Sequence, residues 1–578
     1  MKKLMIGNEA VARGLYEGGV EVVSSYPGTP STEITEFIAK YDDVYSEWAP
    51  NEKVAAEVAF GASLAGARAA CAMKHVGLNV AADPLFTLSY TGVGGGLVVC
   101  VADDPAMHSS QNEQDSRHYA IAAKVPMLEP ADSAECLAFA KEALLLSESF
   151  DTPVLLRLTT RIAHSQSIVE IGERMMRDRP DYKRNGEKYI MMPGNAKKRH
   201  PIVEKRTEAL AKLAESSALN RVEMGGTACG IITSGACYQY VKEALGDSVS
   251  VLKLGMVHPL PTELIRSFAA SVERVVVIEE LDGVIESHCE HIGVKVDGKN
   301  LFTPIGEYSQ ASIASVFGIE EKKHLVVENA IPVRPPMMCA GCPHRGLFYT
   351  LVKNGVTVLG DIGCYTLGAQ PPLAAIDSTL CMGASVSGLH GFNVADNADR
   401  KTACVIGDST FMHSGITGLV NIAYNGSAST VIILDNSITG MTGHQQNPTT
   451  GYTIKGDPAG KVDLEALCRA IGVRRVRVVD PYDLAACDLA IREELAIDEP
   501  SVIISRRPCV LLKSVTPKPA LRISEDLCRG CKKCLSLGCP AISFKGKRAT
   551  INDTLCVGCG ICASLCPFDA IAKGESEK

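Results

Sequence analysis

Residues 402–436 read TACVIGDSTFMHSGITGLVNIAYNGSASTVIILDN, and this stretch decides the fold of the chain around it. A short apolar run ends in Gly407-Asp408-Ser409, a helix-like stretch follows, and a β-branched run ends in Asp435-Asn436. Two apolar runs with a helix between them predict a βαβ unit of a parallel sheet. Ligands bind such sheets at the carboxyl ends of the strands, so we expect Asp408 and Asn436 to approach each other there.

These strand ends are suited to a magnesium ion and a diphosphate. Mg2+ prefers oxygen ligands such as a carboxylate or an amide oxygen, and it commonly shares its coordination shell with phosphates. The glycine at position 407 lets a diphosphate come close to the backbone. Gly-Asp and Asp-Asn are also common in ordinary turns, so either dipeptide alone is weak evidence.

Together the two dipeptides resemble the thiamine diphosphate motif, in which Gly-Asp-Gly is followed, one helix and one strand later, by Asn-Asn. Ser409 replaces the third residue of that motif and Asp435 replaces its first asparagine. The resemblance implies thiamine diphosphate at Gly407, Asp408, Ser409 and Asn436, and Mg2+ at Asp408, Asn436 and the carbonyl oxygen of Ile438.

Eight cysteines near the end of the chain form two copies of one pattern, C-x2-C-x2-C followed by Cys-Pro. Two-cluster bacterial ferredoxins carry this pattern, and the fourth cysteine of each copy binds the other cluster. We therefore assign one [4Fe-4S] cluster to Cys528, Cys531, Cys534 and Cys566, and the other to Cys539, Cys556, Cys559 and Cys562. A pair of zinc knuckles is the alternative, but zinc requires neither the third cysteine nor the repeated Cys-Pro.

Composition limits the remaining classes of protein. A length of 578 residues predicts several domains, and a net charge of -8 gives no basic footprint for nucleic acid. No apolar run approaches the length of a membrane span, and the apolar start is too short for a signal peptide. The 22 cysteines are expected to be reduced thiols or cluster ligands, which indicates a soluble, cytoplasmic protein.

Short apolar runs alternate with helix-like segments up to the cysteine-rich tail, which predicts α/β domains with doubly wound parallel sheets. Prolines at 335–336 and at 517–519 mark two boundaries. We expect an α/β domain over 1–180, a charged connector with a helix over 181–225, a second α/β domain over 226–325, a third over 326–514, and a small α+β two-cluster ferredoxin domain over 520–578.

Five stretches in chain order resemble the 2-oxoacid:ferredoxin oxidoreductases, and most closely the large (alpha) subunits of the indolepyruvate branch. They are Ser25–Thr32 (SYPGTPST), Asn51–Ala55 (NEKVA), Cys339–Arg345 (CAGCPHR), the thiamine motif and the ferredoxin tail. The resemblance implies that residues 1–180 bind the pyrimidine of thiamine and residues 326–514 its pyrophosphate, with the cofactor between these domains. Residues 226–325 would resemble the transketolase C-terminal domain.

The same resemblance implies an activity. In this family a thiamine ylid decarboxylates a 2-oxo acid, coenzyme A takes the acyl group, and electrons leave through [4Fe-4S] clusters to ferredoxin. The expected substrate is an arylpyruvate such as indolepyruvate. The alternatives are pyruvate, 2-oxoglutarate or a branched-chain acid, a non-oxidative decarboxylase, or a non-catalytic electron-transfer subunit. A separate small beta subunit is expected, in a heterotetramer of two large and two small chains.

Glu52 is the candidate carboxylate that activates thiamine. Such a group must be buried beside an apolar ring, where its pKa is raised and it shares a proton with the pyrimidine. Glu52 precedes a small-residue stretch, as the catalytic glutamate does in the pyruvate-using relatives. Glu57 is the rival, and a solvated helix face is the ordinary alternative for either glutamate.

Three further residues are site candidates: Thr29 and Arg117 by resemblance, and His75 by the chemistry of its side chain. Thr29 lies in Gly-Thr-Pro, near where the family holds the substrate carboxylate, and Arg117 lies where relatives place a substrate-binding arginine. A guanidinium can bind a carboxylate in a bidentate way, although an exposed loop arginine is nearly as good an interpretation. His75 could transfer protons, but a core histidine with satisfied hydrogen bonds is the better interpretation.

Four cysteines outside the tail suggest a possible third cluster. In the pyruvate-using relatives, cysteines at similar places bind a cluster beside thiamine, whereas indolepyruvate enzymes are usually described with the two tail clusters alone. Buried thiols without a cluster are the alternative. The four candidates are Cys339, Cys342, Cys364 and Cys509.

Overall fold

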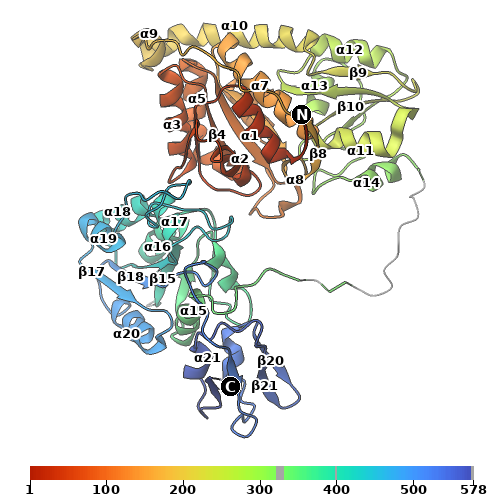
Figure 1. The fold of residues 1–578 in the computed structure, drawn as a ribbon. Coiled ribbons are helices and arrows are strands. Elements are labelled where there is room, and N and C mark those ends of the chain that lie inside the picture. The colour runs from red at the N-terminus through yellow and green to blue at the C-terminus, as the bar shows by residue number, and fades with distance from the viewer. Residues whose placement is uncertain (320–330, 333, 397–399, 574–578) are drawn as a thin grey trace. The chain divides into compact units, whose positions relative to one another are not determined.

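The computed structural model describes residues 1–319, 331–332, 334–396 and 400–573, which form two compact units, Met1–Val327 and Glu328–Lys578. Figure 1 shows the helices and strands of both units. The expected domain boundary between residues 325 and 326 lies outside the described residues. The α/β class predicted from the sequence is confirmed, because both units are built on largely parallel sheets.

The first unit contains a seven-stranded sheet in the order β12-β6-β7-β5-β4-β2-β3. All neighbouring strands are parallel except β12, which is antiparallel to β6. The strands are β2 (Val22–Ser25), β3 (Tyr45–Trp48), β4 (Ala69–Lys74), β5 (Leu97–Asp103), β6 (Met127–Leu128), β7 (Val154–Thr159) and β12 (Met256–His258).

Helices cover both faces of this sheet because its central strands are apolar on both sides. Along β5, Val98 and Cys100 pack into one core with the helices α1 (Gly7–Glu17) and α7 (Ser133–Phe150). Val99 and Val101 pack into a second core with helix α3 (Glu52–Leu64). Alternate residues of a strand point to opposite faces, so a run that is buried throughout produces a doubly wound sheet.

The second sheet of this unit has four strands in the order β13-β10-β11-β9. Its strands are β9 (Arg221–Glu223), β10 (Gly230–Ser234), β11 (Ser250–Leu254) and β13 (Val275–Ile278), and its helices are α11 (Gly235–Leu245), α12 (Thr262–Ala270), α13 (Val284–His291) and α14 (Gln310–Val316). The long helix α10 (Pro193–Ser216) contacts α12 and also α5 (Ala82–Thr91) of the first sheet (Figure 1). Helix α10 therefore connects the helices of the two sheets.

Two pairings in the first unit join segments that are distant in sequence. Strand β1 (Lys2–Ile6) pairs with β8 (Gln166–Glu170). Strand β12, over residues 256–258, pairs with β6 at the edge of the first sheet. We expected residues 256–258 within the second α/β domain. A strand of three residues has too few alternations to be recognised from hydrophobic periodicity.

The second unit contains a five-stranded, fully parallel sheet in the order β14-β15-β16-β18-β17. Its strands are β14 (Thr357–Leu359), β15 (Thr402–Gly407), β16 (Thr430–Asp435), β17 (Arg475–Val479) and β18 (Ser501–Arg506). The main helices are α15 (His344–Lys353), α16 (Ala384–Ala395), α18 (Ile416–Asn425), α19 (Leu464–Ile471) and α20 (Leu484–Glu494). The βαβ unit predicted over 402–436 is therefore present as β15-α18-β16.

The cysteine-rich tail forms two small antiparallel ladders, a 3-10 helix over Lys533–Leu537 and a short α-helix. β19 (Leu521–Ile523) pairs with β22 (Ile571–Lys573), and β20 (Ile542–Lys545) pairs with β21 (Arg548–Ile551). Helix α21 (Ile561–Ser564) follows the second C-x2-C. Apolar side chains share one core with six of the eight cysteines, so most of the cluster ligands are part of the packing of this domain.

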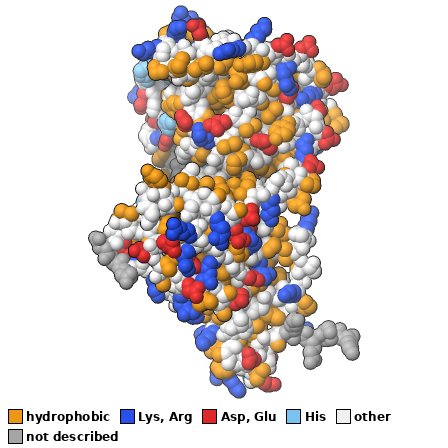
Figure 2. Space-filling view, turned by 90° about the vertical axis from the view of Figure 1, so that its left-hand side faces the viewer, with side chains coloured by type: hydrophobic (Ala, Val, Ile, Leu, Met, Phe, Trp, Pro, Cys, Tyr) orange, Lys and Arg blue, Asp and Glu red, His pale blue; other side chains and the backbone are white. Residues whose placement is uncertain are grey.

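On the face that Figure 2 shows, Lys and Arg side chains lie among Asp and Glu side chains rather than in one basic area. None of the helices in the described ranges combines the length and the apolar character needed to cross a membrane.

Candidate active site

The carboxyl ends of β15 and β16 bring Asp408 and Asn436 together. The two strands are parallel neighbours with Gly407 opposite Leu434, so the residues that follow them emerge at one edge of the sheet. Asp408 is 2% exposed and Asn436 is 8% exposed. The strand-end arrangement expected from the sequence is therefore the arrangement in the structure.

Asp408 is a buried carboxylate without a cationic partner. Its Oδ2 accepts a 2.9 Å hydrogen bond from the hydroxyl of Thr449, and no Lys or Arg pairs with it among the described residues. Burial, together with the nearby Asp435, raises the pKa of Asp408 to about 7. A buried charge of this kind is costly unless a cation neutralises it, so the site fits a divalent ion.

The turn after β16 supplies two further oxygen atoms. The side-chain Oδ1 of Asn436 accepts a 3.2 Å hydrogen bond from the backbone N–H of Ile438, across a left-handed Ser437 with φ of 59°. The carbonyl oxygen of Ile438 accepts no hydrogen bond within the described part of the chain. The donor set at this edge thus fits a hard cation that shares its shell with a diphosphate.

The two candidate glutamates on α3 lie in different environments. Glu52 is 4% exposed and is the first residue of the helix, which is capped by Asn51 through a 2.9 Å bond to the N–H of Val54. Gly77 leaves room for it, because a Cβ there would lie 2.6 Å from Glu52 Oε1. Glu57 is about half exposed and pairs with Lys53 at 2.7 Å. Burial therefore favours Glu52 as the thiamine-activating group.

Arg117 is not placed as the resemblance implied. It is 1% exposed, its Nε donates to Asp115, its Nη1 bonds Glu279, and its Nη2 donates to Asp115 and to two carbonyl oxygens. Glu279 follows β13, so this arginine joins the two sheets of the first unit. These ion pairs do not favour the expected role of Arg117 in binding a substrate carboxylate, because its charge is already neutralised in a buried network.

Thr29 and His75 flank the same end of the first sheet. Thr29 is partly exposed, and its carbonyl oxygen accepts a 3.2 Å bond from the hydroxyl of Ser109. His75 is fully buried, its Nε2 contacts Asn112 at 3.2 Å, and its Nδ1 has no partner among the described residues. Burial lowers the pKa of His75, so it lies in the core as the sequence favoured, but its unpartnered Nδ1 differs from the satisfied hydrogen bonds expected there.

Lys74 is the residue of this edge that sequence reasoning missed. It ends the buried strand β4 and is 9% exposed. Burial lowers the pKa of Lys74 to about 8, against the opposing effects of Asp104 and Glu52. The position of Lys74 at the carboxyl end of an apolar run is a signal in the sequence that could have indicated it.

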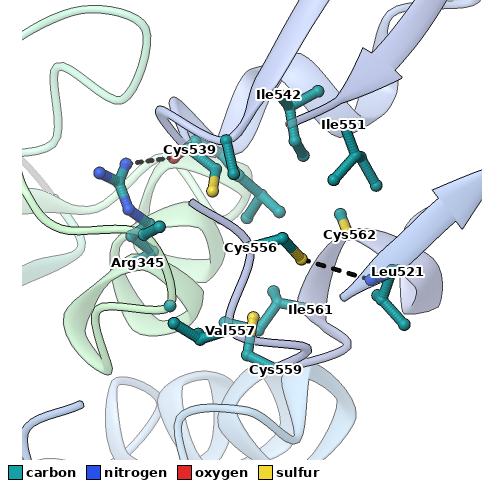
Figure 3. A pocket seen from close by; sticks show the side chains of 14 residues that line it. Arg345, Leu521, Cys539, Ile542, Ile551, Cys556, Val557, Cys559, Ile561 and Cys562 are labelled. Atoms are coloured by element: carbon teal, nitrogen blue, oxygen red, sulfur yellow. Dashed lines mark hydrogen bonds between the residues drawn. The ribbon is translucent and has the colours of Figure 1, made fainter. Parts of the chain in front are cut away.

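The tail cysteines line two cavities that correspond to the two predicted ligand sets. The first cavity is lined by Cys539, Cys556, Cys559 and Cys562, together with apolar side chains such as Ile542 and Ile561 (Figure 3). The sulfur of Cys556 accepts a 3.4 Å hydrogen bond from the N–H of Leu521. The second cavity is lined by Cys528, Cys531, Cys534 and Cys566.

The spacing of these thiols favours clusters over zinc. Four thiols distributed around a cavity are what a cubane cluster needs, and the N–H donor to Cys556 is typical of cluster sulfur ligands.

The four cysteines proposed for a third cluster are also neighbours. Burial, with smaller effects of Cys509 and Cys339, raises the pKa of Cys364 to about 11. Burial, with smaller effects of Cys339 and Cys364, raises the pKa of Cys342 to about 12. A Cβ at Gly440 would lie 3.4 Å from the sulfur of Cys364 and 3.9 Å from Nδ2 of Asn436, so this cysteine group adjoins the Asp408 site.

Arg345 connects that cysteine group to the ferredoxin domain. It is 3% exposed and donates to the carbonyl oxygens of Cys339 at 3.0 Å, Leu537 at 2.8 Å and Gly538 at 2.7 Å, as well as to Met338. It also lines the first tail cavity (Figure 3). Because Gly538 precedes Cys539, one buried cation lies between the two sets of cysteines.

Comparison with known families defines the class of protein. Models match for the thiamine-binding part of pyruvate flavodoxin/ferredoxin oxidoreductase over residues 13–224, the C-terminal TPP-binding domain of thiamine pyrophosphate enzymes over 361–505, and a 4Fe-4S binding domain over 549–572. The chain is a thiamine-dependent oxidoreductase that oxidises 2-oxo acids in a ferredoxin-linked reaction, and it binds thiamine diphosphate and [4Fe-4S] clusters.

Similarity along the whole chain then defines the family. Indolepyruvate oxidoreductase subunit IorA of Archaeoglobus fulgidus is 42% identical, over 100% of this chain and 98% of the relative, and that of Pyrococcus horikoshii is 40% identical over 99% and 97%. The 2-oxoglutarate synthase subunit KorA of A. fulgidus is 24% identical over 50% of this chain and 91% of its own length. The chain belongs to the IorA family of indolepyruvate oxidoreductase subunits.

Proposed function

We propose that this chain catalyses the oxidative decarboxylation of arylpyruvates such as indolepyruvate, with coenzyme A as acyl acceptor and ferredoxin as electron acceptor. The observation that carries the proposal is that one chain holds both the buried strand-end site of Asp408 and two cysteine-lined cavities. A thiamine decarboxylase without electron transfer would have no use for those cavities. The choice of an arylpyruvate rests on the names of the full-length relatives.

The proposed roles follow from burial and chemistry. Asp408, Asn436 and the carbonyl oxygen of Ile438 bind Mg2+, which holds the diphosphate beside Gly407 and Ser409. When bound, thiamine diphosphate supplies the nucleophilic carbon and the electron sink for loss of CO2. The carboxyl of Glu52 shares a proton with the pyrimidine N1′. Thr29 stays a substrate-site candidate, since it borders the strand ends near Lys74.

Electrons leave one at a time through the cysteine sets. We place one [4Fe-4S] cluster at Cys539, Cys556, Cys559 and Cys562, a second at Cys528, Cys531, Cys534 and Cys566, and a third at Cys339, Cys342, Cys364 and Cys509. Support for the third comes from the proximity of its cysteines to one another and to Asn436. Arg345 donates hydrogen bonds to the carbonyl oxygens of Cys339 and Gly538, which supports an electron path from this set to the first tail cavity.

We propose further that the working enzyme is a heterotetramer of two such chains and two small beta subunits. The support is that the full-length relatives are named as subunits of an oxidoreductase.

One anaerobic assay tests the substrate and the mechanism together. The chain with its small subunit is given indolepyruvate, phenylpyruvate, pyruvate, 2-oxoglutarate or 2-oxoisovalerate, with coenzyme A and a viologen dye. We expect the highest kcat/KM with an arylpyruvate, and a higher kcat/KM for dye reduction with pyruvate would contradict the substrate proposal. Glu52→Gln is expected to lower kcat by at least about 100-fold, since general acid–base groups contribute on that order. The matched variant Glu57→Gln, on the exposed side of the same helix, should stay near full activity.

A further inference from the structure

We propose that Lys74 binds the carboxylate of the 2-oxo acid substrate, in the place that the resemblance gave to Arg117. The inference rests on the proposed function, because it takes a 2-oxo acid as the ligand and Glu52 as the neighbouring thiamine-activating group. It adds the residue that recognises the anionic end of the substrate. Four observations on the first unit carry it.

The first observation is that Lys74 is a buried cation with unused donors. Its ammonium has three N–H groups, of which one donates to the carbonyl oxygen of Ser109 at 3.0 Å. No carboxylate forms an ion pair with it within the described residues. Buried lysines are almost always paired, and one that is not requires an explanation in terms of a ligand or a function.

The second observation is its place in the fold. Lys74 is the last residue of β4, a central strand of the seven-stranded sheet whose six residues are all buried. Asp103, the last residue of the neighbouring strand β5, is followed directly by Asp104. Open α/β sheets bind their ligands at this carboxyl edge. The ammonium group therefore lies where the topology of the sheet predicts a ligand.

The third observation is that the surroundings hold the side chain in place. Gly28 borders its stem, and a Cβ at that position would lie 3.2 Å from Cγ of Lys74. Ser109 is fixed by a 2.8 Å bond from its N–H to Asp104 Oδ2 and by its hydroxyl, which donates to the carbonyl oxygen of Thr29. The stretch around Thr29 that resembles the family's substrate loop therefore meets Lys74 through Gly28 and Ser109.

The fourth observation is the electrostatic relation to Glu52. The charge of Glu52 raises the pKa of Lys74 against the larger effect of burial, so the two groups lie close enough to act on each other. A substrate carboxylate bound at Lys74 would thus lie near the group proposed to activate thiamine. Arg117 is less suited to this role than Lys74, because Asp115 and Glu279 already bind its guanidinium in the buried network.

The test measures recognition of a charge rather than turnover. Binding of indole-3-acetate and of its neutral amide, indole-3-acetamide, is titrated by calorimetry under anaerobic conditions into the thiamine-loaded complex with its small subunit. We expect the unmutated complex to prefer the acid by about tenfold or more, since charge-assisted bonds outweigh neutral ones. In Lys74→Met the acid should lose that preference while the amide binds as before, and Lys74→Arg should keep a preference for the acid.

A matched lysine and the cofactor serve as controls. Lys53→Met removes an exposed lysine that pairs with Glu57 and Asp83, and it should leave both affinities unchanged. Thiamine diphosphate affinity should be the same in all variants. A Lys74→Met complex that still prefers the acid, or that loses thiamine diphosphate instead, overturns the inference.

A second measurement needs no variant. The preference of the unmutated complex for the acid should fall between pH 7 and pH 9, as Lys74 loses its proton. The groups facing it are Glu52, Asp104 and His75. A preference that is constant over this range overturns the inference even if Lys74→Met fails to fold. If the substrate survey finds an aliphatic acid fastest, isovalerate and isovaleramide replace the indole pair, so failure of the arylpyruvate proposal and failure of Lys74 are separate results.

Discussion

The backbone N–H of Cys509 donates a 2.9 Å hydrogen bond to the carbonyl oxygen of Asn436. This bond joins the chain after β18 to the chain after β16, so a cysteine of the possible third cluster is fixed directly against a proposed Mg2+ ligand. Cys364 approaches the same turn from the other side through Gly440. A cluster at these cysteines would therefore lie within the same strand-end site as the diphosphate.

Iron content tests this arrangement. Three [4Fe-4S] clusters require about twelve irons per chain, whereas the tail alone holds about eight. We expect about twelve in the anaerobically purified complex, and about eight in Cys364→Ser or Cys509→Ser. Cys468→Ala, at a buried cysteine of α19, is the matched control and should keep the full content. About eight irons in the unmutated chain would contradict the third cluster.

Arg345 should adjust the potential of the cluster that follows Gly538. Its guanidinium is buried, lines the first tail cavity, and has carbonyl oxygens rather than a carboxylate as its hydrogen-bond partners. Removing a positive charge beside a cluster stabilises its oxidised form, so Arg345→Met should lower the midpoint potential by roughly tens of millivolts. Arg345→Lys, which keeps the charge, should shift it less.

A redox titration followed by electron paramagnetic resonance measures these potentials. Arg522→Met is the comparison variant, because Arg522 is an exposed cation on β19 of the same domain. An unchanged potential in Arg345→Met, with the cluster signal intact, would leave this arginine a purely structural role in joining the two loops.

Arg117 should affect stability rather than substrate affinity. Arg117→Met leaves Asp115 and Glu279 as buried carboxylates without their partner, which typically costs about 3–5 kcal/mol. The expected result is a lower unfolding temperature by circular dichroism, with the KM for the 2-oxo acid unchanged in the folded fraction. Arg161→Met, which breaks an exposed pair with Glu307, should cost less than about 1 kcal/mol. A raised KM without loss of stability would restore the substrate-binding role.

Local patterns were enough to predict the βαβ unit and the cysteine sets, because strand ends and C-x2-C spacing are encoded within a few residues. The buried network of Arg117 could not be predicted, because its partner Glu279 lies 162 residues away and ion pairs between distant segments leave no mark on local sequence. The strand over 256–258 was missed for a related reason, since it pairs with β6 from another part of the chain. Lys74 stands out only because several elements bury its side chain. Hydrophobic periodicity along the sequence does not indicate which charged residues such packing buries.

Lys74 should also reduce the stability of the folded unit, as expected of a group kept for binding. Its folded pKa of about 8 lies below the ordinary value of 10.5, chiefly because burial disfavours the charged form. Below pH 8 the lysine is protonated in both states, so the full cost of the buried charge is present. Between pH 8 and pH 10.5 the unfolded chain binds more protons, so the free energy of unfolding rises with pH.

Lys74→Met should therefore raise the unfolding temperature at pH 7 by a few degrees, for a gain on the order of 3 kcal/mol at most. The gain should shrink towards pH 10, because the unmutated lysine is then neutral in the folded state beside Glu52, Asp104 and His75. Thermal unfolding at pH 7 and pH 10, followed by circular dichroism under anaerobic conditions, measures this gain in stability. The gain or loss in Lys53→Met should not depend on pH. A gain that is equal at both pH values would mean that packing, and not the buried charge of Lys74, limits stability at this edge.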